Sequence, residues 1–162
     1  MSNSLTAPLL AGSVIGSIGD SFVIAEWQDP GGSPGPPRLI APLHLHNKDD
    51  EAWYVLEGVL HIRKGVEEIE ARAGSAVFVP RGTPHTYWNP GPDRSRYLLV
   101  MTTNTYAMIQ AIHALSERTP ATLRALFARY DSESSREQTH TRCPPPELAT
   151  TCHTASHPDH CP

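Results

Sequence analysis

Short apolar stretches separated by turn residues recur between residues 20 and 103. The stretch 20–27 is rich in β-branched and aromatic residues, a composition typical of a strand. The gaps between the later stretches contain Gly, Pro, Asn or Asp, as expected where a strand ends at a turn. The pattern predicts strands at 20–27, 39–46, 51–56, 59–64, 67–72, 75–79, 85–89 and 96–102. Strands at such short intervals are typical of an all-β antiparallel barrel or jelly roll.

The pattern changes after residue 103. Apolar residues recur at helical intervals over 104–130, and Thr119 before Pro120 is typical of a helix cap followed by proline at the first helical position. We therefore expect two C-terminal helices over 104–130. Residues 1–19 are expected to form a loosely ordered N-terminal arm with at most a short strand. The stretch 131–162 has almost no large apolar residues, so we expect a disordered tail.

Length and charge limit the classes of function. A chain of 162 residues fits one domain with a sizeable core. The net charge of −4 and the pI near 6.1 argue against a nucleic-acid partner. No apolar run approaches the length of a membrane span, and the N-terminus lacks the basic start of a secretory signal. We therefore expect a cytoplasmic protein without a membrane partner.

The cysteines are not expected to hold the fold together. Cys143, Cys152 and Cys161 all lie in the tail, outside the predicted barrel. His153 and His157 have a spacing found in zinc sites, but the cysteines do not form the matching pairs. A structural zinc site in the tail is therefore not our expectation.

Two segments contain residues suited to metal binding. His44 and His46 are two positions apart in a predicted strand, so their side chains point to the same face. The polar stretch 47–50 follows, and Glu51 then opens a strand that can return beside the first. His85 comes directly after a turn rich in Pro and Gly. Three imidazoles and one carboxylate suit a first-row divalent metal with one or two positions left open.

The spacing of these residues resembles the two motifs of the cupins. His44 to Gly58 reads His-x-His-x4-Glu-x6-Gly, and Gly74 to Asn89 reads Gly-x5-Pro-x-Gly-x2-His-x3-Asn. One position departs from the first motif, since Arg38 stands where the family usually has glycine. The resemblance implies a cupin double-stranded β-helix, or jelly-roll barrel, with a divalent metal (Fe, Mn, Ni, Co, Cu or Zn). It implies the metal ligands His44, His46, Glu51 and His85.

Tyr87 is a further candidate for the active site. It lies on the same face of its predicted strand as His85, so its phenol could position a substrate or act as a general acid. Alternatively, Tyr87 packs in the barrel wall with its hydroxyl at the rim, and we favour this interpretation. Arg38 could hold an anionic substrate or be a solvated charge at the rim.

The resemblance extends to single-domain cupins similar to quercetin dioxygenase. It implies a metal-dependent dioxygenase or oxidoreductase that acts on a small organic molecule, with Glu51 and Tyr87 as catalytic candidates. The alternatives are a metal-dependent isomerase, cyclase or decarboxylase without redox chemistry, and a small-molecule-binding cupin without catalysis. Barrels of this family often pair, so we expect a homodimer. We also expect truncation after Tyr130 to leave metal content and stability nearly unchanged.

Overall fold

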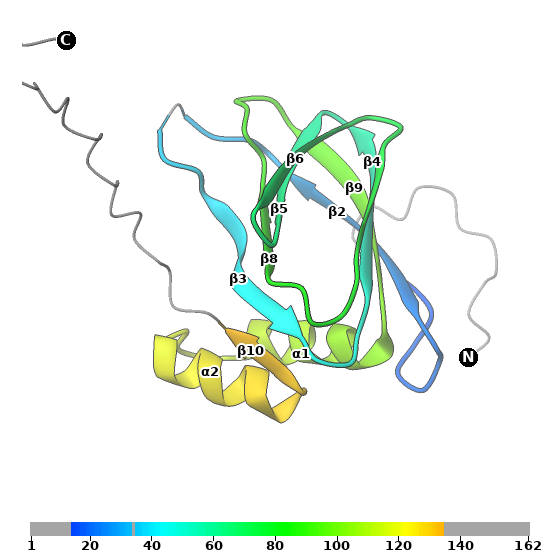
Figure 1. The fold of residues 1–162 in the computed structure, drawn as a ribbon, viewed down its shortest axis with the longest axis vertical. Helices are drawn as coiled ribbons and strands as arrows, with labels where there is room; N and C mark the ends of the chain where they lie inside the picture. The colour runs from blue at the N-terminus through cyan, green and yellow to red at the C-terminus, as the bar shows by residue number, and fades with distance from the viewer. Residues whose placement is uncertain (1–13, 34, 135–162) are drawn as a thin grey trace, which may run out of the picture.

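Two five-stranded antiparallel sheets face each other and form a barrel (Figure 1). The structure is a computed structural model that describes residues 14–33 and 35–134. One sheet contains, in spatial order, β1 (Val14–Ile15), β2 (Val23–Asp29), β9 (Ser95–Met101), β4 (Glu51–Glu57) and β7 (Ala76–Val79). The other contains β10 (Ser132–Ser134), β3 (Leu39–His46), β8 (His85–Trp88), β5 (Val59–Lys64) and β6 (Glu67–Arg72). The jelly-roll barrel expected from the sequence is confirmed.

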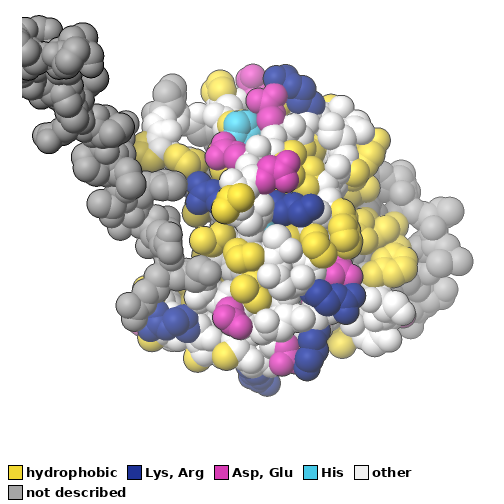
Figure 2. Space-filling view, in the orientation of Figure 1, with side chains coloured by type: hydrophobic (Ala, Val, Ile, Leu, Met, Phe, Trp, Pro, Cys, Tyr) yellow, Lys and Arg dark blue, Asp and Glu magenta, His cyan; other side chains and the backbone are white. Residues whose placement is uncertain are grey.

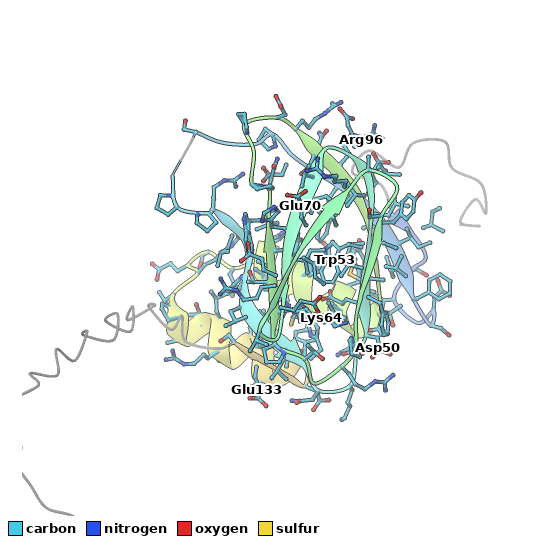
Figure 3. All side chains as sticks on the ribbon, turned by 45° about the horizontal axis from the view of Figure 1, so that its top comes forward. Asp50, Trp53, Lys64, Glu70, Arg96 and Glu133 are labelled. Carbon is cyan, nitrogen blue, oxygen red and sulfur yellow. The ribbon has the colours of Figure 1, made fainter. Side chains whose placement is uncertain are left out.

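The core lies between the two sheets and is built from alternate residues of each strand. In β4, Trp53 and Val55 are buried while Tyr54 between them is exposed. In β9, Tyr97, Leu99 and Met101 are buried in the same way. Figure 3 shows Trp53 in the interior of the barrel. Because successive side chains of a strand point to opposite faces, this alternation removes one face of each sheet from water.

Gly58 makes the turn between β4 and β5 possible. Its φ is +73°, and a Cβ at this position would lie 2.5 Å from the carbonyl oxygen of Arg94. Gly74, in the turn after β6, also has a positive φ of +86°, but a Cβ there would meet nothing within 4 Å. Gly58 is therefore required for both backbone conformation and close packing, and Gly74 for conformation alone.

Two helices lie across one end of the barrel (Figure 1). The helix α1 (Thr103–His113) is capped by Thr102, whose hydroxyl accepts the Thr105 N–H at 3.2 Å. The helix α2 (Pro120–Arg129) is capped by Thr119 and has proline at its start, as predicted. Met108 and Phe127 are the buried apolar residues of the two helices. Neither helix has the length and hydropathy of a membrane-spanning segment.

The structure differs from the sequence-based expectation at the start of the C-terminal tail. Residues 132–134 form β10, which pairs with β3 so that Ser132 lies opposite His46. Asp131 has a positive φ of 51°, and its carbonyl accepts the Asn47 N–H at 2.9 Å. The strand is held through main-chain groups, which leave no trace in the hydrophobic pattern. The remaining tail, with Cys143, Cys152, Cys161, His153 and His157, lies outside the described residues.

Charged side chains of both signs are scattered over the face drawn in Figure 2. Lys and Arg side chains lie interspersed with Asp and Glu side chains over this face, and hydrophobic side chains gather toward its right edge. Such a mixture gives no extended field of one sign on this face.

Candidate metal centre

The four predicted ligands meet inside the barrel near the end covered by the helices. His44 and His46 lie at the end of β3, and Glu51 and His85 are the first residues of β4 and β8. All four side chains are buried, and one ligand atom from each lies within 4.8 Å of the others. His44 and His46 share a face of β3, as strand geometry predicted, and His85 pairs with His44 across the ladder.

Backbone carbonyls hold two of the three imidazoles. The His44 Nδ1–H donates to the Pro42 carbonyl oxygen at 2.7 Å, and the His85 Nδ1–H donates to the Thr83 carbonyl oxygen at 2.9 Å. A carbonyl oxygen can only accept, so Nδ1 of both rings has a proton, and in the neutral form of His44 the lone pair is on Nε2. Metal-binding histidines are usually held in this way through the nitrogen that does not bind the metal.

The ring of His46 fits the same scheme. Its Nδ1 lies 2.8 Å from the Ser132 hydroxyl oxygen. Its Nε2 is buried without a hydrogen-bond partner in the described part of the chain and lies 3.4 Å from Glu51 Oε2. The same carboxylate oxygen lies 2.8 Å from His85 Nε2. A buried ring nitrogen without a partner is unfavourable, and a metal ion among these atoms would satisfy it. The residues present therefore fit a divalent metal.

Burial also sets the protonation of the candidate ligands. Burial, followed by the charge of His85, lowers the pKa of His44 to about 3. For Glu51, burial raises the pKa, but the neighbouring His46 and His85 imidazoles outweigh it and leave the pKa below its usual value. At neutral pH, His44 is therefore a neutral imidazole and Glu51 a carboxylate. These are the forms that bind metal ions.

A cavity of about 360 Å³ adjoins the cluster on the side of the helices. His44, Glu51 and Tyr87 contribute to its wall together with residues of α1 and α2. Most of the remaining wall is apolar, and Arg118 and His113 are exposed polar residues at its edge. The apolar part includes Trp27, Ile40, Leu99, Met108, Ile109, Ile112, Leu123 and Phe127. The cavity suits a small, largely apolar organic molecule.

Tyr87 lies in this wall and is buried. Its hydroxyl accepts a hydrogen bond from the Tyr97 hydroxyl at 3.4 Å, and its ring contacts the Trp53 ring with centroids 5.3 Å apart. Burial and the neighbouring Tyr97 raise the pKa of Tyr87 well above its usual value. The phenol therefore stays protonated at neutral pH. Tyr87 packs in the barrel wall, as the favoured interpretation of the sequence expected. Its side chain is buried and lines the cavity, whereas that interpretation placed the hydroxyl at the rim. Its catalytic role stays a prediction.

Arg38 lies outside this cavity. It forms an ion pair with Asp29, its side chain is largely exposed, and it lines a separate groove that also contains Trp88. Of its two predicted environments, the rim is the one observed.

Two residues near the cluster were missed by the sequence analysis. Asp49 was placed in a polar loop, yet it is buried and accepts hydrogen bonds from Thr102 Oγ1 and Asn104 Nδ2, both at 2.7 Å. Ser132 was placed in the tail, yet it contacts His46. The only sequence signal that could have identified Asp49 was a carboxylate three residues after the candidate ligand His46. No local sequence signal identified Ser132.

Comparisons with known proteins agree with this architecture. The family model described as "Cupin domain" matches residues 33–101. The chain is 39% identical over 59 residues to the oxidoreductase iacF of Pestalotiopsis fici, a match that covers 36% of this chain and 28% of that protein. The chain thus spans well under half of this curated relative.

Among solved structures, TT1209 of Thermus thermophilus is similar with a TM-score of 0.44 and 26% identity, over 51% of this chain and 72% of that one. An uncharacterised protein with a double-stranded β-helix domain from Klebsiella pneumoniae is similar with a TM-score of 0.46 and 20% identity, over 57% and 76% of the two chains. The cupin-domain model thus matches the part of the chain that contains both sequence motifs and most strands of the jelly-roll barrel.

Proposed function

We propose that this protein is a metal-dependent oxidoreductase of the dioxygenase type that acts on a small organic molecule. The proposal rests on one observation: three imidazoles and one carboxylate are gathered, buried, at the wall of a mostly apolar cavity. The local similarity to an oxidoreductase supports redox chemistry, although it covers 28% of that protein.

His44, His46, His85 and Glu51 would hold the metal. A redox-active ion such as Fe, Mn, Ni, Co or Cu would supply electron transfer and Lewis acidity to the centre, whereas Zn would supply Lewis acidity alone. The apolar side chains of the cavity would bind the substrate and exclude bulk water from it. The protonated phenol of Tyr87 would donate a hydrogen bond or a proton to an oxygen atom of the substrate.

Elemental analysis tests the metal centre directly. Protein purified without chelator is compared with His85→Ala, which removes one imidazole. We expect near-stoichiometric iron, manganese, nickel, cobalt or copper in the wild type and much less in the variant. Full metal content in His85→Ala would refute the ligand assignment.

The redox assignment is tested by oxygen consumption of the loaded protein with small aromatic diones and flavonols. Zinc as the bound ion, or no oxygen uptake with any redox-active ion, would favour a non-redox isomerase, cyclase or decarboxylase instead.

We also propose that the protein is a homodimer. Support comes from the outer face of the first sheet, where Tyr54 and Phe78 on neighbouring strands are 42% and 55% exposed. Large exposed apolar side chains next to each other are typical of protein interfaces. Light scattering after gel filtration should give twice the chain mass, and a monomer mass for Phe78→Glu. A monomeric wild type would refute the proposal.

The cytoplasmic location stays a prediction.

A further inference from the structure

We propose that Ser132 is a positioning residue that orients the His46 ring for metal binding, so that the C-terminal strand β10 is part of the metal centre. This inference rests on the proposed metal centre. It concerns a segment that the hydrophobic pattern assigned to a disordered tail.

The direction of the hydrogen bonds follows from the chemistry of the serine hydroxyl. Ser132 Oγ lies 3.0 Å from the Tyr130 carbonyl oxygen and donates to it, because a carbonyl can only accept. The hydroxyl has one proton, so it accepts the hydrogen bond from His46 Nδ1–H at 2.8 Å. His46 Nε2 is then left with its lone pair, 3.4 Å from Glu51 Oε2. The serine thus selects the tautomer that a metal ligand needs.

His46 differs from the other two histidines in the origin of this support. His44 and His85 donate to carbonyls two residues before them, Pro42 and Thr83, so their own strands hold their rings. The partner of His46 is 86 residues away in the sequence. Both side chains are almost completely buried, with 1% exposure for His46 and 2% for Ser132. Water is therefore poorly placed to replace the serine hydroxyl.

The segment that contains Ser132 is connected by hydrogen bonds to the loop between His46 and Glu51. The Tyr130 carbonyl accepts from Asn104 Nδ2 at 3.1 Å, and the same amide group donates to Asp49 at 2.7 Å. Figure 1 shows β10 beside the end of β3, and Figure 3 shows Glu133 of this strand at the same end of the barrel as Asp50. The segment also reaches a second ligand, since the Phe127 ring of α2 packs edge-on against His44 with centroids 5.4 Å apart.

Metal affinity in three variants tests the role of the hydroxyl. Ser132→Ala removes the acceptor, Ser132→Thr keeps it, and Ser134→Ala is the matched control on the same strand, since Ser134 has no side-chain hydrogen bond to any described residue. Affinities for Mn(II) and Co(II) are measured by competition with a chelator. We expect a loss of about 10–100-fold in Ser132→Ala, as is typical when the support of a metal-binding histidine is removed. Ser132→Thr and Ser134→Ala should stay within about threefold of the wild type. Wild-type affinity in Ser132→Ala would overturn the inference.

The tautomer of His46 in the metal-free wild type is a second measurement. It would not depend on Ser132 if the serine had only a structural role. Long-range proton–nitrogen NMR should show a protonated Nδ1 and an unprotonated Nε2, and Ser132→Ala should show a mixture of tautomers. A wild-type ring protonated at Nε2 would overturn the inference even if Ser132→Ala does not fold. A wild type that binds neither ion would instead refute the metal centre itself. The two failures are therefore distinguishable.

Discussion

Acid should destabilise the metal-free protein through His44. In the folded protein, burial and the neighbouring His85 lower the pKa of this imidazole from 6.5 to about 3. In the unfolded chain the ring is solvated and its pKa returns to the ordinary value. Between pH 6.5 and pH 3 the unfolded state therefore binds one more proton at this position than the folded state. The free energy of unfolding must then fall as the pH falls through this range.

The loss of unfolding free energy depends on how far the pH lies below 6.5, the ordinary pKa of histidine. Each pH unit below 6.5 costs about 1.36 kcal/mol, so the loss at pH 5 is about 2 kcal/mol. Glu51 acts in the same direction at lower pH. Its folded pKa lies below its ordinary value of 4.5, so its contribution is present above pH 4.5 and is lost as the pH falls further. A comparison between pH 7.5 and pH 5 therefore leaves out the contribution of Glu51.

Urea unfolding in the presence of chelator measures this loss. The wild type is compared with His44→Gln, in which no group titrates at this position. Other titrating groups are shared by the two proteins, so the difference between their pH dependences reports His44 alone. We expect the wild type to lose about 2 kcal/mol more than the variant between pH 7.5 and pH 5. Parallel pH dependences would show that the ring is not held neutral by burial.

Three further predictions concern the stability of the fold. Metal at 100 times its dissociation constant should stabilise the chelator-treated protein by about 2.7 kcal/mol, and an unchanged melting temperature would contradict metal binding. Phe127→Ala removes a side chain that is 1% exposed, so unfolding in urea should show a loss of about 3–5 kcal/mol, whereas a loss below about 1 kcal/mol would mean that α2 is not packed on the barrel. Gly58→Ala should be more destabilising than Gly74→Ala, which should cost about 1–2 kcal/mol for its positive φ alone. Equal losses would contradict the contact between Gly58 and Arg94.

Part of the candidate metal cluster was predictable from local strand geometry, and the resemblance to the cupin motifs implied the rest. Two residues of one strand point to the same face when they are two positions apart, and this rule brings His44 and His46 together. A turn rich in Pro and Gly indicated the strand that begins at His85. The bounds of β3, β5 and β6 were predicted to the residue, because each strand ends at a charged or turn residue. The strand β2 begins at Val23, later than the predicted start at residue 20, because polar residues precede it.

The hydrogen bonds of Asp49 and Ser132 beside the cluster were not predictable, because they join distant parts of the chain. Asp49 looks like a solvated loop residue until Thr102 and Asn104 are placed beside it. Ser132 sits in a segment too polar to form a core, and its strand is held by main-chain hydrogen bonds and a hydroxyl group. Hydrophobic patterns report the burial of apolar surface, so they do not detect this kind of docking. Truncation after Tyr130, expected from the sequence to be harmless, would remove the partner of His46.

The long sequence separation between His46 and Ser132 has a consequence for synthesis on the ribosome. At about 5–20 residues per second, 86 residues take roughly 4–17 s to add. All four candidate ligands precede residue 86 and therefore leave the ribosome well before the serine does. His85 and Ser132 are 47 residues apart, so for roughly 2–9 s the growing chain has all four candidate ligands while His46 still lacks its partner. Ions that meet the nascent barrel in this interval encounter a looser set of ligands than the finished protein presents.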